Sequence, residues 1–201
     1  RLKYSYLIEG EKITLYDQLL ELIAQGRLVL GICNGFQVII KLGLLPTPQA
    51  EQPSVSLTTN RKGRFEDRWV YLVADSSSPC IFTQGIQHIE LPIRHGEGRI
   101  EADQETVLQP LLTNHQVPLQ YANKEGRATE RYPENPNGSP WGIASLCNEQ
   151  GNVMGLMPHP EAFNHYTNHP QWTRKLYQGE DGDGLQLFKN AYQYLEQGFT
   201  A

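Results

Sequence analysis

The sequence predicts a single α/β domain with a mostly parallel central sheet and flanking helices. The chain has 201 residues, which suffices for one domain with a substantial core. The apolar run 28–32 leads through Cys33 into apolar residues at helical spacing, a strand–turn–helix unit that places a side chain at the end of a buried strand. Further strand-like and helix-like segments follow without an internal repeat or a domain boundary, and we expect the functional site at the strand ends.

The individual elements follow from apolar spacing and from residues that start or stop a helix. A helix is predicted over Thr14–Gln25, because its apolar residues share one face, Thr14 can cap its start and Gly26 can end it. The helix behind Cys33 should stop near Gly43. β-branched and aromatic composition predicts further strands at Val55–Leu57, Trp69–Val73, His88–Ile93, Pro118–Ala122, Trp141–Leu146 and Asn152–Leu156. Further helices are predicted at Thr106–Leu112, Gln171–Tyr177 and Leu185–Glu196. The polar stretch Asn123–Pro140 is predicted to be a long loop.

Composition excludes several function classes. The 17 Lys and Arg residues and 22 Asp and Glu residues give a net charge of −5 without long runs of either sign, which argues against nucleic acid or a membrane surface as partner. No apolar segment approaches the roughly 18 residues of a membrane span. Three widely spaced cysteines, Cys33, Cys80 and Cys147, favour neither a disulfide framework nor a metal site, and fit a cytoplasmic protein.

Cys33 is the candidate nucleophile. Gly31 and Gly35 flank it at the sharp turn, where close backbone approach requires small residues. The turn would place the sulfur at a helix N-terminus, whose dipole favours the thiolate. The alternative is a buried structural cysteine, which is the more common role of a free cysteine. The residues that could act with Cys33 therefore decide between the two.

His159 and Glu161 are the candidate partners of Cys33. Pro158 and Pro160 bias the chain around His159 toward an extended conformation, in which side chains two residues apart project to the same side. A histidine held by a carboxylate is the base and orienting group of a catalytic triad. A surface His and Glu on either side of a proline is the alternative, but the order Cys, His, x, Glu is more specific than the pair alone.

His95 is a candidate binding residue within the charged segment 94–99. Its two glycines permit close backbone approach to a ligand, and its charges could hold a zwitterion or a partner surface. A charged surface turn is equally compatible with this spacing. The histidines in polar, loop-like sequence are expected to face solvent; they are His115, His165 and His169.

Five motifs together resemble one enzyme family. They are GICNGFQ (31–37), KLGLLP (41–46), RHGEGR (94–99), NPNGSPWGIA (135–144) and LMPHPE (156–161). This set is similar to the glutaminase components of phosphoribosylformylglycinamidine synthase, which are class I, triad-type glutamine amidotransferases of purine biosynthesis. The resemblance implies a flavodoxin-like, three-layer α/β fold, with residues 1–201 forming a single glutamine amidotransferase domain.

The resemblance also implies an activity and its residues. A Cys33–His159–Glu161 triad would hydrolyse L-glutamine to glutamate and ammonia through a γ-glutamyl thioester. The N–H of Asn34 would donate to the oxyanion. The implied substrate-binding residues are Asn34, Gln37, His95, Gly96 and Glu97.

The implied partner is the synthetase subunit or domain that uses the ammonia to convert formylglycinamide ribonucleotide to the amidine. ATP and magnesium would be bound by that partner, with no cofactor or metal on this chain. Family members begin with a β-α-β unit and a Gly-Gly-Phe turn that supplies a second oxyanion donor; this sequence shows neither, so the domain is expected to be N-terminally incomplete. Two other functions remain open: a triad amidotransferase of another pathway, and a structural or regulatory domain without turnover.

Overall fold

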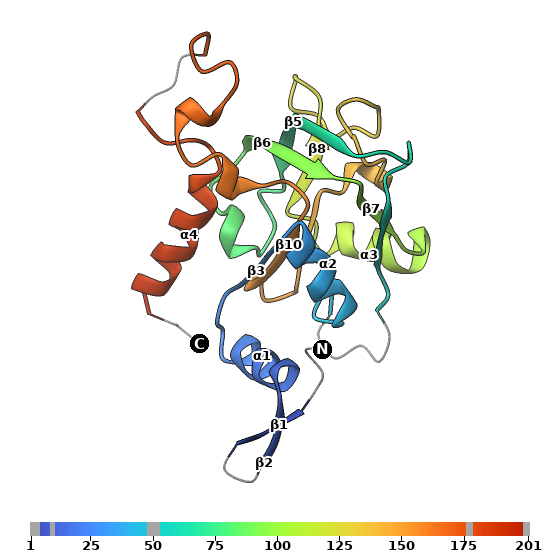
Figure 1. Cartoon of the computed structure of the whole chain (residues 1–201), viewed down its shortest axis with the longest axis vertical. Coiled ribbons are helices and arrows are strands. Elements are labelled where there is room, and N and C mark those ends of the chain that lie inside the picture. Colours follow the sequence, from blue (N-terminus) through green and yellow to red (C-terminus); the bar gives the residue numbers. More distant parts are fainter. Residues whose placement is uncertain (1–4, 9–10, 48–52, 176–178, 199–201) are drawn as a thin grey trace.

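In the computed structural model, residues 5–8, 11–47, 53–175 and 179–198 are described (Figure 1). The helices are α1 (Leu15–Ala24), α2 (Asn34–Lys41), α3 (Gln109–Thr113) and α4 (Leu185–Glu196). The strands are β1 (Ser5–Ile8), β2 (Glu11–Thr14), β3 (Val29–Ile32), β4 (Ser56–Thr59), β5 (Glu66–Ala74), β6 (His88–His95), β7 (Glu97–Glu101), β8 (Leu119–Ala122), β9 (Ser145–Cys147) and β10 (Val153–Leu156).

The described strands form small mixed sheets. Two of these have three strands, in the orders β3-β10-β9 and β6-β5-β8, and two more are the pairs β1-β2 and β4-β7. The α/β class is confirmed, but the expectation of a mostly parallel sheet is wrong for the described strands, because β3–β10 is the only parallel pair among them. Strands β9 and β10 are joined by residues 148–152 alone, and so short a connection allows antiparallel pairing only. Strand β5 pairs antiparallel with both β6 and β8.

Strand β10 divides the interior into two cores. Val153 faces a core formed with α1, α2 and α3, whereas Met154 and Leu156 face a second core formed with β5, β6 and α4. Figure 1 shows α2 and α3 on one side of β3 and β10, and α4 on the other. This is the alternation expected of a strand buried on both faces. Between them, Gly155 leaves space for Phe36 of α2, since a Cβ there would lie 2.0 Å from the Phe36 ring.

Local signals predicted the helices better than the strand ends. Helix α1 begins at the predicted cap, where Thr14 and Asp17 bond each other's backbone N–H groups. The strand predicted from Trp141 begins only at Ser145, because Trp141 lies in a 3₁₀ turn with a φ of 51°. Residues 171–175 form turns where a helix was predicted, and 176–178 lie outside the described residues.

Candidate active site

Cys33 lies at the turn between β3 and α2. Its φ of 51° and ψ of −104° are sparsely populated for a residue with a side chain, a strain of about 1–3 kcal/mol that is found mainly at functional sites. The first turn of α2 rests directly on β3, since a Cβ on Gly31 would lie 2.9 Å from the carbonyl carbon of Gly35. The Cys33 N–H donates to Leu156 O at 2.8 Å, which ties the turn to the end of β10.

His159 follows the end of β10 and is held from two sides. Its Nδ1 is 2.6 Å from Glu161 Oε1, so the two side chains meet as expected. The predicted extended conformation is wrong, however, because Pro160–Ala162 form a 3₁₀ turn, and this turn brings Glu161 back to the imidazole. Its backbone N–H donates to Pro92 O of β6 at 2.8 Å. Because the carboxylate accepts, the proton of neutral His159 sits on Nδ1 and leaves Nε2 as the basic nitrogen.

Cys33 and His159 line the same pocket, which has a volume of about 410 Å³. The lining residues are Cys33, Asn34, Gln37, Phe65, Arg94, His95, Gly96, Glu97 and His159. Every predicted site residue is among them except Glu161, which is hydrogen-bonded to His159. A larger pocket of about 540 Å³ between β6 and the start of α4 contains neither Cys33 nor His159, so we assign the site to the smaller pocket.

Two lining residues, Phe65 and Arg94, were not singled out from the sequence. Arg94 belongs to a recognised motif, so a signal for it existed. Phe65 follows a basic, glycine-containing turn, and no sequence signal marks it. Its side chain is 63% exposed at the pocket.

The charges of the site favour proton transfer to His159. The pKa of His159 is raised, chiefly by the nearby Cys33 thiol and also by Glu161, against the lowering effect of burial. The Cys33 sulfur hydrogen-bonds Arg94 O at 3.9 Å, and the buried Nε2 of His159 makes no hydrogen bond. The thiol is thus close enough to influence the imidazole, while the nucleophile–base bond itself is not formed in this geometry; such bonds commonly tighten when substrate binds.

His95 lies inside the protein. The side chain is only 3% exposed, which excludes the charged surface turn as its environment. Its Nδ1 lies 3.1 Å from Asn60 Oδ1. Burial, followed by the charge of His159, lowers the pKa of His95 to about 4, so the ring is neutral near pH 7.

The buried His95 predicts an acid-dependent loss of stability. Its pKa is near 6.5 when unfolded and about 4 when folded, so between these values the unfolded chain binds a proton that the folded protein does not. The free energy of unfolding should therefore fall as the pH is lowered through this window, by up to about 3 kcal/mol. Urea unfolding at pH 7 and pH 4.5 measures it. His95→Gln should flatten this part of the pH dependence, and equal slopes for wild type and His95→Gln would contradict the assignment.

The turn before α4 packs against the segment that carries His159 and Glu161. A Cβ on Gly184 would lie 2.0 Å from Pro160 O, and one on Gly182 would lie 2.6 Å from the Phe163 ring. From the sequence, this acidic turn is typical of a solvated loop, and no local pattern indicates the contact. The two glycines bring the C-terminal part of the chain against the backbone next to the proposed base.

Gly184→Ala should displace that segment. The φ of −61° at Gly184 suits any residue, so the effect arises from the collision with the backbones of Pro160 and Phe163. We expect the rate of any reaction at this site to fall by roughly 10²-fold, because a shift of about 1 Å in a catalytic group has an effect of that size. Steady-state kinetics measure it. Gly179→Ala is the control, since its φ of 91° strains the neighbouring chain but its methyl meets nothing within 4 Å; wild-type activity in Gly184→Ala would contradict the role of this contact.

His169 is buried, so the expectation that it faces solvent is wrong. It is 2% exposed, its ring centroid is 4.3 Å from that of Trp69, and its Nε2 is 3.2 Å from Glu90 Oε1. Lys175 forms an ion pair with the same carboxylate. The Trp69 ring and the partly buried Glu90 carboxylate hold the His169 ring inside, and they anchor the segment after Glu161 on β5 and β6.

Within the part of the chain that the structure describes, no group of three or more His, Cys, Asp or Glu side chains is placed to hold a metal ion. Among the same residues, no helix has both the length and the apolar character needed to cross a membrane.

Comparison with known proteins identifies the family of this chain. Residues 9–195 match the CobB/CobQ-like glutamine amidotransferase domain. The phosphoribosylformylglycinamidine synthase subunit PurQ of Dehalococcoides mccartyi is 39% identical over 188 residues, covering 94% of this chain and 69% of that protein. The same subunit of Methanococcus maripaludis is 40% identical over 198 residues, covering 92% of this chain and 72% of that protein.

A solved structure shares the fold. A chain in the structure of PurLQS from Thermotoga maritima matches with a TM-score of 0.65 and 29% identity, over 90% of this chain and 68% of that chain. The chain belongs to the glutamine amidotransferase family, in the branch of the PurQ subunits.

Proposed function

We propose that the protein hydrolyses L-glutamine to glutamate and ammonia for phosphoribosylformylglycinamidine synthesis, with Cys33 as nucleophile, His159 as base and Glu161 as its orienting group. One observation carries this proposal: the strained cysteine turn and the carboxylate-bound histidine, 126 residues apart in numbering (159 − 33), line one pocket. This is the constellation of nucleophile, base and orienting group that acyl transfer requires.

The first half-reaction forms a thioester. His159 Nε2 takes the thiol proton, and the Cys33 sulfur attacks the carboxamide carbon of glutamine, whose oxygen becomes an oxyanion. Asn34 opens α2, where the first N–H groups of a helix lack intrahelical acceptors, so its N–H is available to the oxyanion. Collapse of this intermediate breaks the C–N bond; the leaving nitrogen takes the proton from His159 and departs as ammonia.

The second half-reaction releases glutamate. His159, neutral again, takes a proton from a water molecule that attacks the thioester carbon. The C–S bond then breaks, the sulfur recovers the proton as the Cys33 thiol, and glutamate leaves. Throughout both steps, Glu161 holds Nδ1 protonated and stabilises the transient imidazolium.

The remaining pocket residues suit the amino-acid end of glutamine. Gln37 donates from Nε2 to Glu97 O at 3.3 Å, which joins α2 to the opposite wall of the pocket. Glu97 supplies a carboxylate at this wall for the amino group of a zwitterionic substrate. The Arg94 side chain instead pairs with Asp67 at 3.8 Å, and its carbonyl oxygen contacts Cys33. We assign Gln37, His95, Gly96 and Glu97 to substrate binding.

The ammonia is consumed by the synthetase partner, which converts formylglycinamide ribonucleotide to formylglycinamidine ribonucleotide. We assign ATP and magnesium to that partner and no cofactor to this chain. The widely spaced cysteines and the biosynthetic role fit a cytoplasmic enzyme.

Glutamine labelled with ¹⁵N in its side-chain amide tests this function. The protein is incubated with the synthetase partner, ATP, magnesium and formylglycinamide ribonucleotide, and we expect glutamate together with labelled amidine. Glutamate without labelled amidine would favour an amidotransferase of another pathway. No glutamate in the presence of the partner would favour a domain without turnover.

A further inference from the structure

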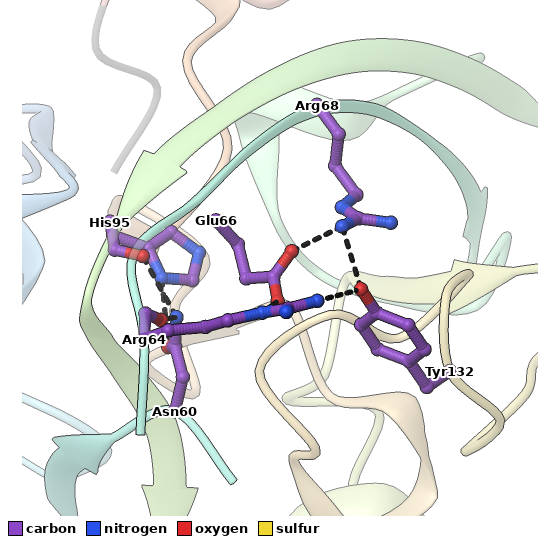
Figure 2. Close-up of polar contacts among 6 residues, drawn as sticks. All are labelled: Asn60, Arg64, Glu66, Arg68, His95 and Tyr132. Atoms are coloured by element: carbon purple, nitrogen blue, oxygen red, sulfur yellow. Dashed lines mark hydrogen bonds and ion pairs between the residues drawn. The ribbon is translucent and has the colours of Figure 1, made fainter. Parts of the chain in front are cut away.

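Asn60 is hydrogen-bonded to residues of the pocket wall, although it does not itself line the pocket. Its side chain is 2% exposed. Its Nδ2 donates to His95 O at 2.8 Å and to Arg64 O at 3.0 Å (Figure 2). Its backbone N–H donates to Gly96 O at 2.9 Å. The carbonyls of two wall residues are thus directed toward Asn60.

The same side chain sets the protonation of His95. Both partners of Asn60 Nδ2 are carbonyl oxygens, so the amide orientation is determined: a flipped amide would bring oxygen against oxygen. Its Oδ1 can only accept, so the His95 Nδ1 atom 3.1 Å away must carry the ring proton. The other nitrogen, Nε2, is an unprotonated acceptor, buried and without a hydrogen bond.

An ionic network around the buried Glu66 adjoins Asn60 on its other side. Arg64, whose carbonyl Asn60 binds, donates from Nε to Glu66 Oε1 at 3.0 Å. Glu66 is 2% exposed and is also bound by Arg68, and Tyr132 Oη accepts from Arg64 at 2.6 Å and from Arg68 at 2.9 Å. Figure 2 shows these side chains in one connected group beside His95.

The network reaches the pocket at two places. Glu66 is the cross-strand partner of His95 in the β5–β6 pair. Phe65, between Arg64 and Glu66, lines the pocket and lies against Gly96, where a Cβ would be 3.9 Å from the Phe65 ring. The same network therefore supports both the pocket wall at His95 and the pocket rim at Phe65.

We propose that Asn60 is a positioning residue for the substrate: it holds the His95–Glu97 wall in its binding shape and fixes His95 as a neutral acceptor at Nε2. This inference rests on the proposed function, because the wall is assigned to glutamine. The reacting groups are held by other contacts, since Cys33 is bound to Leu156 and His159 to Pro92 and Glu161. Loss of the Asn60 side chain should therefore affect binding rather than chemistry.

Kinetics of Asn60→Ala test the binding role. The variant leaves His95 Nδ1 and two buried carbonyls without their partner, and we expect the KM for glutamine to rise roughly tenfold while kcat stays within about threefold of wild type. Asn148→Ala is the matched control. Asn148 is also fully buried, and its side chain bonds Asn152 Oδ1 at 2.8 Å and Val153 N at 2.9 Å in the β9–β10 turn, which the pocket does not include. It should lose stability without a change in KM.

A second measurement is independent of turnover. In ¹⁵N NMR of histidine-labelled protein, His95 should appear as the neutral Nδ1–H tautomer in wild type and in Asn148→Ala, and should lose this preference in Asn60→Ala. An unchanged KM, or an unchanged tautomer, would overturn the inference. The proposed function fails separately, if wild type with its synthetase partner forms no glutamate.

Discussion

Cys33→Ala is expected to abolish glutamine hydrolysis, with a loss of about 10⁴–10⁶-fold, because removing the nucleophile leaves only binding and oxyanion contacts to promote the reaction. Cys33 is the residue whose backbone is strained at the pocket, at a φ of 51°. Glutamate release in the presence of the synthetase partner measures the effect.

Cys80→Ala is the matched control for that substitution. Cys80 is also a free cysteine, but it is fully buried in the second core, outside the pocket. Cys80→Ala should keep the rate of hydrolysis within about twofold of wild type, because a change in the core far from the pocket has little effect on activity. It should lose some stability, because it leaves a small cavity. Full activity in Cys33→Ala would refute the assignment of the nucleophile.

Glu161→Gln is expected to reduce kcat/KM by about 10²–10⁴-fold, because an amide no longer stabilises the imidazolium and can hold the wrong tautomer. It should also move the acidic limb of the pH profile. The carboxylate raises the pKa of His159, so without it the imidazole keeps its basic form to lower pH and the limb shifts toward acid. The profile of kcat/KM against pH measures both effects.

Glu149→Gln, an exposed carboxylate in the β9–β10 turn, is the control for that profile and should leave both the rate and the limb unchanged. If the limb of Glu161→Gln stayed at the wild-type pH, the coupling between Glu161 and His159 would be absent in solution. The Glu161 side chain is 48% exposed. A rate close to wild type would indicate that solvent screens its carboxylate so strongly that it does not stabilise the His159 imidazolium.

The proposed reacting groups could be predicted because their signals are local. Flanking glycines and a strand-to-helix change of apolar spacing mark Cys33 within a few residues. The two prolines mark the segment that carries His159 and Glu161, whose side chains meet at 2.6 Å, although they do so across a 3₁₀ turn and not along an extended chain. Glycine and proline constrain the backbone dihedrals of their own segment, so these signals can be recognised from a few neighbouring residues.

The environment of those groups was not predictable. The contacts between Asn60 and His95, between Gly184 and Pro160, and between His169 and Trp69 join residues far apart in sequence, and none leaves a periodic pattern. His169 shows the difficulty most clearly: polar neighbours suggest solvent, yet an aromatic ring and a carboxylate bury it to 2% exposure. Strand pairing was hidden for the same reason, since register depends on partners across the sheet.

The sequence by itself determined the kind of chemistry: a cysteine at a strand–helix turn, a histidine with its carboxylate, and motifs of a glutamine amidotransferase. Only the tertiary structure decided how these groups are held. The β3–β10 pairing brings Cys33 beside the end of β10, and the Asn60 network lies behind His95. The glycines of the turn before α4 allow that turn to pack against Pro160. The division has a physical cause. Reactive geometry at a turn is set by short-range sterics, whereas burial, tautomer and pKa depend on which distant groups fold against the site.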